Sequence, residues 1–530
     1  MQKTITLKLL PSEAANEKLV QQYIAQAEAV KVSAVSGFTI LKHSIDARGK
    51  QPWVNLSLKA YINEPFQQRQ RLVFDFKDVG KSERTVIIIG AGPAGLFAAL
   101  QLIEKGIRPV ILERGKDVRA RRRDLAALNK EGEVNPESNY CFGEGGAGTY
   151  SDGKLYTRSS KRGDINRILN LFVRFGAEEQ ILYEAHPHIG TNKLPHIITA
   201  MRKTITDCGG EFLFEKRVVD FLVKDDEIKG VATSDGNAFN ANAVILATGH
   251  SARDIFELCH AKKILIEQKS FALGVRIEHP QSLIDTAQYH CEARGEFLPP
   301  ASYSWVQQVD GKGVFSFCMC PGGIIAPAAT SPGELVVNGW SPSKRNNPYA
   351  NSGIVVTVDE KDVFNAIKKE KLIIKNAGNA LMLMEFQKSV EVKAFTAGGG
   401  KFVAPAQRLV DFTENKLSGS LPGCSYLPGL NSSELKNVLP SFVHRSLQQA
   451  FKDYGKKMKG YFTNEAVVVA TESRTSSPVR IPRDAETLQH PQIKNLYPCG
   501  EGAGYAGGIV SAAMDGERVA NQIAGTVKAS

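Results

Sequence analysis

The glycines of one GAGPAG run have the clearest chemical meaning, because the run lies between an apolar stretch and a helical pattern. In a GxGxxG turn, the first glycine (Gly90) permits the tight turn and the second (Gly92) lets a pyrophosphate approach the backbone. Gly95 lets the helix and the strand pack closely. Pro93 and Ala94 open the helix, whose free N–H groups favour phosphate. The spacing therefore predicts a dinucleotide-binding turn.

A carboxylate follows this turn at the spacing that dinucleotide binding requires. Glu113 ends the second apolar run, about 20 residues after Gly90. Its oxygens can accept hydrogen bonds from free ribose hydroxyls and would repel a 2′-phosphate. We therefore expect FAD or NAD rather than NADP, with Glu113 and the neighbouring Arg114 at the ligand.

Two later segments decide between FAD and NAD. The apolar run Val244–Gly249 ends in Ala-Thr-Gly, and the segment 495–509 carries another glycine-rich turn. Together with the first turn they resemble the glutathione-reductase-type FAD-binding superfamily, which implies FAD bound without a covalent link. That superfamily usually has Gly-Asp where this chain has Gly-Glu, and a tight turn without a ligand is the alternative. The cofactor contacts expected here and in the strand-like run 211–223 are Val218, Thr248, Gly249, Gly500, Glu501, Gly507, Gly508 and Ile509.

A further glycine-rich stretch, residues 138–155, leaves its backbone free to lie against a ligand. It is similar to a stretch in a family of bacterial FAD-dependent, or NAD-utilising, dehydrogenases. Other motifs of that family match at His188–Thr191, Phe317–Gly323 and Thr475–Arg480, and the likeness covers essentially the whole chain. The resemblance implies FAD but assigns no substrate. The cofactor contacts expected in this stretch are Gly145, Gly146, Ala147, Gly148, Thr149, Ser151, Asp152 and Lys154.

Histidines and arginines near these motifs are the candidates for acid–base chemistry and substrate binding. A flavin that exchanges a hydride often needs a partner for the accompanying proton, and histidine suits neutral pH. His250 directly follows the Ala-Thr-Gly turn, so we expect it at the active site. Arg474 and Arg480 could bind a carboxylate substrate, and salt bridges that join two domains are the alternative. Three further histidines are weaker candidates: His186, His188 and His196.

The cysteines bear on disulfide-reductase chemistry, which needs a redox pair beside the flavin. Cys318 and Cys320 come nearest to such a pair, but residues two apart on a strand are poorly placed for a disulfide. Ordinary packing or cleft lining is the alternative. The chain lacks a second strand–GxGxxG–helix unit. We therefore expect electrons to reach FAD from the substrate itself or from NAD(P)H that binds transiently.

Charge and composition argue against other classes of protein. The 66 Lys and Arg against 55 Asp and Glu give a net charge of +11, a modest excess for 530 residues, so we expect a small-molecule partner rather than nucleic acid. The basic run Arg119–Arg123 is expected to be a solvated helix face or a phosphate contact. The eight cysteines lack zinc spacing, so no metal site is expected. Without an apolar leader or membrane span, we expect a soluble, cytoplasmic protein.

An α/β protein of several domains must position these motifs. Residues 1–80 are predicted to form a small N-terminal α+β module that could bind a partner. Residues 81–268 are predicted to form the first segment of a Rossmann-type FAD-binding domain, and residues 465–530 its second segment, with an apolar strand and a closing helix. The segment 269–464, with strand-like runs between Pro/Gly-rich turns, is predicted to be an inserted, β-rich α+β cap.

The leading hypothesis is an FAD-dependent oxidoreductase or dehydrogenase that transfers a hydride between flavin N5 and an unidentified small molecule under the cap. The alternative is a flavin-dependent RNA-modifying or RNA-associated protein, favoured by the positive charge and by the use of the same fold in tRNA modification. A third hypothesis gives FAD a structural or sensory role, with the N-terminal module recruiting a partner. Substrate, direction and oligomeric state are left open.

Overall fold

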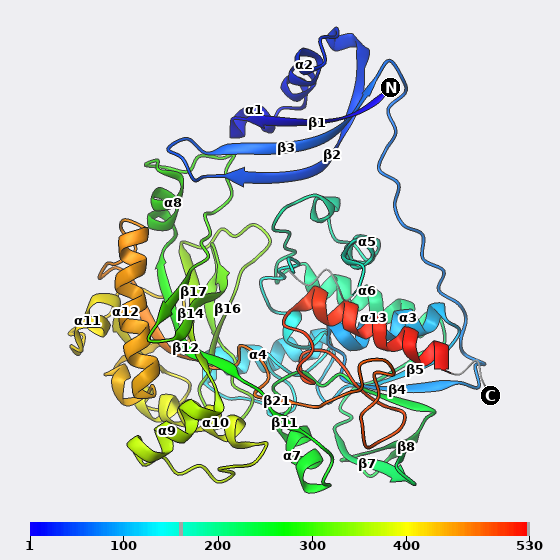
Figure 1. Ribbon diagram of the computed structural model, residues 1–530, viewed down its shortest axis with the longest axis vertical. Helices are drawn as coiled ribbons and strands as arrows, with labels where there is room; N and C mark the ends of the chain where they lie inside the picture. The colour runs from blue at the N-terminus through cyan, green and yellow to red at the C-terminus, as the bar shows by residue number, and fades with distance from the viewer. Residues whose placement is uncertain (158–162, 527–530) are drawn as a thin grey trace.

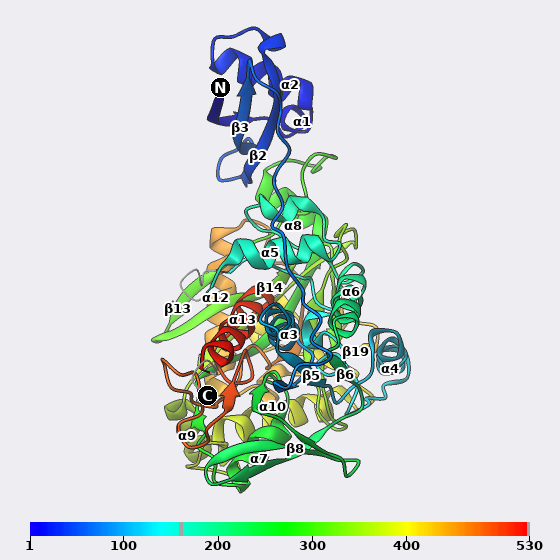
Figure 2. The same cartoon turned by 90° about the vertical axis from the view of Figure 1, so that its right-hand side faces the viewer.

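The computed structural model describes residues 1–157 and 163–526, and its N-terminal module stands at one end of the molecule (Figures 1 and 2). The module has the order βαββ and is an α+β unit, as the sequence predicts. Its three antiparallel strands lie in the order β1-β3-β2, and inward-facing residues such as Ile5 and Leu7 pack with the helices above them. Its elements are β1 (Gln2–Leu9), α1 (Pro11–Ala14), α2 (Glu17–Ala27), β2 (Val35–Asp46) and β3 (Trp53–Ile62).

A parallel five-stranded sheet forms the centre of the next domain, in the order β22-β10-β4-β5-β6. The continuous apolar runs become strands buried on both faces, as such runs do in parallel sheets. Because the strands are parallel, their carboxyl ends meet at one edge, where ligands bind in folds of this kind. The strands are β4 (Thr85–Ile89), β5 (Arg108–Leu112), β6 (Glu211–Leu213), β10 (Ala243–Leu246) and β22 (Leu496–Pro498).

Helices cover one face of this sheet, and a small antiparallel sheet lies on the other side (Figure 1). The long helix at the C-terminus packs along the helix of the glycine turn. The covering helices are α3 (Pro93–Glu104), α5 (Ile165–Arg174), α6 (Leu194–Asp207) and α13 (Ile509–Thr526). The second layer contains β7 (Val218–Lys224), β8 (Glu227–Thr233), β9 (Ala238–Asn240) and α7 (Arg253–Ala261).

The inserted domain contains a seven-stranded sheet in the order β13-β14-β17-β12-β20-β18-β19, which confirms the predicted β-rich α+β cap. Its strands are β12 (Phe271–Pro280), β13 (Val306–Val309), β14 (Lys312–Cys320), β17 (Tyr349–Val358), β18 (Ala404–Arg408), β19 (Leu430–Ser432) and β20 (Val467–Glu472). A two-stranded ribbon and five helices pack on it: β15 (Ile324–Pro327), β16 (Val337–Trp340), α8 (Gln281–Tyr289), α9 (Glu360–Glu370), α10 (Met382–Gly398), α11 (Leu409–Glu414) and α12 (Ser441–Lys457).

Strand β20 corrects one expectation. The sequence pattern predicts that its residues belong to the second segment of the FAD-binding domain, yet β20 pairs with β12 and β18 inside the cap sheet. An apolar run suits a strand buried on both faces of any sheet, so the run itself does not tell which sheet it joins. The chain returns to the parallel sheet only after β20. The chain enters the cap after β11 (Glu267–Gln268) and leaves it before β21 (Val479–Arg480), and these two strands pair with each other.

Candidate functional site

A cavity of about 380 Å³ lies where the carboxyl edge of the parallel sheet meets the cap. It is lined by residues from both domains, including most of those singled out by the sequence. These are Gly90, Gly92, Pro93, Ala94, Glu113, Arg114, Gly146, Ala147, Gly148, Ser151, Asp152, Lys154, Val218, Thr248, Gly249, His250, Cys318, Arg474, Glu501, Gly507, Gly508 and Ile509. Six expected residues are not part of the lining: Gly95, Gly145, Thr149, Cys320, Arg480 and Gly500.

The glycines of the first turn divide into two roles. Gly90 has φ +103°, and a Cβ there would lie 2.5 Å from the carbonyl oxygen of Ala247. A Cβ at Gly95 would lie 2.0 Å from the carbonyl oxygen of Gly90, so this glycine allows α3 to pack against the turn. Gly92 precedes α3 and has open space where a side chain would lie. Gly90 and Gly95 therefore shape the turn, and Gly92 leaves room for a ligand.

Glu113 lines the cavity but is already engaged by backbone donors. Its Oε1 accepts hydrogen bonds from the N–H groups of Gly115 and Gly143, each at 2.9 Å, and its Oε2 accepts one from Ala91 at 2.9 Å. A carboxylate oxygen can accept two hydrogen bonds, so Oε2 keeps one lone pair for a ribose hydroxyl. The side chain thus fixes two loops as well as facing the cavity, a role that the sequence motif did not indicate.

Arg121 fixes the conformation of the glycine-rich stretch, residues 138–155. It lies on α4 (Val118–Glu131), and its side chain is fully buried rather than on the solvated face expected for its basic run. The guanidinium donates to four carbonyl oxygens at 2.8 to 2.9 Å and to Thr149 Oγ1 at 3.3 Å. Arginine suits this role because its fork presents five N–H groups. The carbonyls belong to Asn139, Tyr140, Glu144 and Gly146.

Thr149 and Gly145, both expected to contact the cofactor, lie in the interior of the glycine-rich stretch instead. Thr149 is fully buried, and its hydroxyl donates to the carbonyl oxygen of Glu144 at 2.7 Å. Gly145 has φ +79°, and a Cβ there would lie 2.1 Å from Thr149 Oγ1. Both residues therefore shape the loop without facing the cavity. A threonine hydroxyl in a tight turn often forms a hydrogen bond with nearby backbone, as Thr149 does here.

A charged cluster lies at the cap side of the cavity. Asp152 is 1% exposed and pairs with Arg345 at 2.8 Å and with Lys154 at 3.9 Å. The Lys154 ammonium also donates to the carbonyl oxygen of Met319 in the cap. Burial works against ionisation of Asp152, but the two cations outweigh it and lower its pKa. Lys154 therefore connects the glycine-rich stretch to β14.

His250 lines the cavity as expected, and its Nδ1 lies 3.3 Å from the hydroxyl of Ser251. Burial lowers its pKa to about 4, and the charges of Arg474 and Arg253 add to the shift. The imidazole is therefore neutral near pH 7 and suited to accept a proton or a hydrogen bond. The other three histidines, His186, His188 and His196, are absent from the residues that line the cavity.

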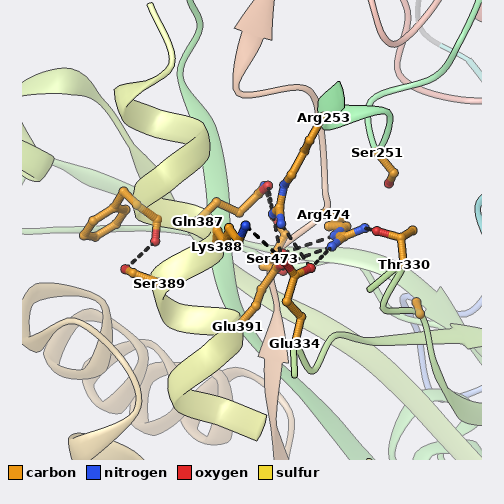
Figure 3. Close-up of polar contacts among 12 residues, drawn as sticks. Ser251, Arg253, Thr330, Glu334, Gln387, Lys388, Ser389, Glu391, Ser473 and Arg474 are labelled. Carbon is orange, nitrogen blue, oxygen red and sulfur yellow. Dashed lines mark hydrogen bonds and ion pairs between the residues drawn. The ribbon is translucent and has the colours of Figure 1, made fainter. Parts of the chain in front are cut away.

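Arg474 belongs to a buried network of ion pairs between the domains (Figure 3). It bonds Glu391 at 3.0 Å and Glu334 at 2.9 Å, and it donates to Thr330 at 2.6 Å. Arg253, at the start of α7, pairs with the same two carboxylates. Burial opposes ionisation of Glu391, but the two arginines outweigh it and lower its pKa to about 2. Arg474 lines the cavity, yet its guanidinium is held by carboxylates of the cap and is not free for a substrate, while Arg253 of α7 joins the same carboxylates to the other domain.

Arg480 does not reach the cavity, contrary to the expectation of a substrate-binding role. Its side chain is exposed, lies 3.8 Å from Glu267, and stacks over the ring of Tyr505. Strand β21 brings the chain back to the parallel sheet at the surface, and residue 480 points outward there. The nearness of a basic residue to a motif in the sequence did not predict which side of the strand it would occupy.

Segment 500–509 approaches the cavity from the C-terminal side. Burial raises the pKa of Glu501 to about 7, and Lys269 partly opposes this. Gly507 and Gly508 have open space where side chains would lie, just before α13 begins at Ile509. Gly500 is packed against Ala94 and donates its N–H to Asp515 at 2.8 Å, so it shapes the turn without lining the cavity.

The cavity fits FAD on two observations. The start of α3 and the start of α13 both face it, and Gly92, Gly507 and Gly508 leave open space at these two helix N-termini, which favour phosphates and polar ring atoms. Residues at the end of β5 and the start of β7 line one part of the cavity, and cap residues line another.

Among residues 1–157 and 163–526, no group of ligands suits a metal ion, and no helix could cross a membrane.

Comparisons with known proteins agree with this geometry. Residues 83–125 match an FAD binding domain, residues 270–475 match the C-terminal domain of FAD-dependent proteins, and residues 1–61 match a domain of unknown function. An uncharacterised protein of Clostridium beijerinckii is 38% identical over 507 residues, which cover 92% of each chain.

Two further relatives are similar over shorter spans. The tRNA uridine 5-carboxymethylaminomethyl modification enzyme MnmG of Alkaliphilus metalliredigens is 30% identical over 31% of this chain and 24% of its own. A thiamine thiazole synthase of Aeropyrum pernix is 26% identical over 32% of this chain and 55% of its own. Among solved structures, CtdE in complex with FAD matches 84% of this chain and 88% of its own, at 11% identity and a TM-score of 0.33.

Proposed function

Because the chain belongs to the family of FAD-dependent flavoproteins that includes the Clostridium beijerinckii protein, we propose that it is an oxidoreductase acting on a small molecule held between FAD and the cap. When bound, FAD supplies hydride transfer at N5 of its ring system. NAD(P)H is proposed as a transient electron donor. One observation carries the proposal: a single cavity is lined both by the dinucleotide turn and by cap residues.

The chain's own residues give this cavity the means to bind and to move a proton. The glycine turn and the start of α13 would hold the cofactor. His250, neutral near pH 7, would accept a proton from a substrate. Glu501, whose pKa burial raises to about 7, and the adjacent Lys269 would set the charge near the ring. The pair of Asp152 and Lys154 would orient a polar substrate from the cap side.

An anaerobic stopped-flow experiment tests the proposal. The purified yellow protein is mixed with NADH and, separately, with NADPH, and the flavin absorbance near ~450 nm is followed, since nicotinamides carry the hydride. Rapid bleaching by either supports a transient nicotinamide site and makes the protein a reductase. If neither bleaches it, reduced metabolites are screened in the same way. A flavin that no reductant in the screen bleaches would contradict an oxidoreductase function.

An RNA-modifying function is the second candidate, supported by the partial match to MnmG and by the net charge of +11. The match spans 24% of that enzyme, so it supports a shared FAD fold more than a shared substrate. This candidate predicts RNA that co-purifies at low salt and dissociates as salt rises, because phosphate contacts release counterions. A preparation free of RNA at low salt would contradict it.

A further inference from the structure

The strand that carries Cys318 and Cys320 is irregular at these two residues. Strand β14 pairs with β17 as far as Phe317, and the pairing resumes only at Cys320, after a shift in register. Cys318 has φ +47°, in the left-handed region that non-glycine residues rarely adopt. This bulge replaces the regular strand on which we expected the two cysteines to be poorly placed.

The irregularity brings the two thiols together. On a regular strand, residues two apart have Cα atoms roughly 6.7 Å apart, at the upper limit for a disulfide. Here the side chains of Cys318 and Cys320 are hydrogen-bonded to each other, and Cys320 Sγ lies 3.2 Å from the carbonyl oxygen of Cys318. A bulge also bends the strand and redirects side chains. The two sulfurs are therefore neighbours within one strand.

The surroundings of the two thiols differ in a way that suits a nucleophile and its partner. Cys318 lines the cavity, whereas Cys320 is fully buried behind it. The hydrogen bond from Cys320 and, against the effect of burial, the charges of Lys154 and Arg276 lower the pKa of Cys318. The same hydrogen bond and burial raise the pKa of Cys320. Of the two thiols, Cys318 therefore favours the ionised form and Cys320 favours the protonated form.

Arg276 fixes the geometry of this pair. Its Nη2 donates to the carbonyl oxygen of Cys318 at 3.2 Å, and its Nε pairs with Glu472 at 2.8 Å. The arginine is fully buried, so its charge acts on the thiolate with little screening by water. A cation held next to a cysteine favours the ionised, reactive form of the thiol.

We propose that Cys318 and Cys320 form a reversible dithiol–disulfide pair in the cavity wall, and that the small-molecule substrate of this oxidoreductase is a disulfide compound. The inference rests on the proposed function. The Cys318 thiolate attacks one sulfur of the substrate, forming a mixed disulfide and releasing one thiolate. The Cys320 thiol then attacks Cys318 Sγ, which forms the internal disulfide and releases the second half of the substrate as a thiol.

The disulfide must then be reduced so that the pair can react again, and the electron balance defines what this reduction requires. The internal disulfide needs two electrons and one proton, equivalent to one hydride, to give the Cys318 thiolate and the Cys320 thiol. FAD, bound and reduced as in the proposed function, would supply that hydride. The net reaction consumes one disulfide and one hydride and yields one thiol and one thiolate.

Trapping experiments on the FAD-loaded protein test the pair with oxidised glutathione as the probe. After the reaction, the protein is denatured, free thiols are alkylated, and its mass and peptides are measured. Wild type should lose two alkylation sites, both at Cys318 and Cys320. The Cys320→Ser variant should retain one glutathione on Cys318, because the second attack is removed. The control variant Cys291→Ser, at a half-buried cysteine outside the cavity lining, should behave as wild type.

The inference is overturned if wild type keeps both thiols free, or if Cys320→Ser carries no glutathione. Cys318→Ser should form neither product, and the wild-type and Cys320→Ser results remain decisive if that variant does not fold. Anaerobic reduction of the oxidised protein should consume about four electrons per FAD in wild type and about two in Cys320→Ser, since a dithiol pair is a two-electron couple. About two electrons in wild type would contradict the link to the flavin. A colourless protein would instead contradict the proposed function.

Discussion

At the scale of single residues, Arg121 illustrates how one buried side chain can order a glycine-rich stretch. Glycines leave the backbone free to approach a ligand, but the same freedom costs entropy when the loop is fixed. The guanidinium of Arg121 offsets this by satisfying four carbonyls of one loop at once. Its basic neighbours in the sequence hide this role, because nothing in a run of arginines indicates which one points inward.

Replacement of Arg121 by methionine should weaken both folding and cofactor binding. The buried carbonyls would lose their donors, which costs on the order of 3 kcal/mol. We expect a lower free energy of unfolding in urea and a lower ratio of FAD to protein after purification. The exposed Arg123→Met is the matched control and should change stability by less than about 0.5 kcal/mol. Equal effects of the two variants would show that Arg121 does not support the loop.

Glu501 should make stability depend on pH. Its pKa is raised from 4.5 to about 7 in the folded protein, so its contribution is fully present below about pH 4.5 and is lost as the pH rises through 7. Glu501→Gln lacks this titration. The melting temperature of wild type relative to the variant should therefore fall from about pH 5 to about pH 8, whereas the exposed Glu83→Gln should follow wild type. A constant difference would contradict the shifted pKa.

At the scale of elements, the glycine turn and α3 form one unit, and the roles of two of its glycines can be distinguished by experiment. Gly95→Ala places a Cβ against the carbonyl of Gly90, so it should lower the melting temperature and abolish FAD binding together. Gly92→Ala places its Cβ in open space. We expect that variant to fold with an unchanged melting temperature in its FAD-free form but to bind FAD at least tenfold more weakly. Loss of folding in Gly92→Ala would contradict its assignment to the ligand.

The ion-pair network ties α7 and α10 together across the domain boundary. Arg474→Met would leave Glu334 and Glu391 with Arg253 alone, and breaking a buried pair in this way costs about 3 to 5 kcal/mol. Unfolding in urea should shift to lower concentration by a corresponding amount. The neighbouring Arg480→Met removes an exposed cation and should change stability by less than about 0.5 kcal/mol. Similar shifts for both would rule out the network as a major tie between domains.

The elements themselves were largely predictable from the sequence. The βαβ unit from Thr85 to Leu112 lies where the apolar runs and the helical pattern around the glycine turn indicate. The sequence does not predict which sheet β20 joins, because pairing partners depend on the whole fold rather than on local pattern. The bulge at Cys318 was also not predictable, since a CxC spacing in an apolar run is typical of a regular strand.

At the scale of the whole molecule, the N-terminal module touches both larger domains through one region of β2. His43 exchanges backbone hydrogen bonds with Tyr183 and Ala185, and its ring lies 3.0 Å from Glu184. Ile45 of β2 and Ala47, the first residue after β2, pack against the core of the cap. The module therefore bridges the two domains that form the cavity (Figure 2). The sequence identified the module but gave no indication of this contact.

The candidate site was predictable where a motif binds backbone to ligand, and much less so where side chains from distant segments meet. The glycine turn, Glu113 and His250 all line the cavity as expected. Arg480 does not, and Arg474 is held by carboxylates that lie about 80 and 140 residues away in sequence. Such pairings follow from how distant segments of the cap pack together, which no local pattern specifies.

The most direct test of this account is the FAD content of the purified protein and its location. We predict about one FAD per chain, released by denaturation without a covalent remnant, and lost in Gly92→Ala although that variant folds, because the phosphates lie against that turn. A protein that contains no FAD and cannot be reconstituted with it, or one whose Gly92→Ala variant binds FAD as tightly as wild type, would contradict the placement of the cofactor in this cavity.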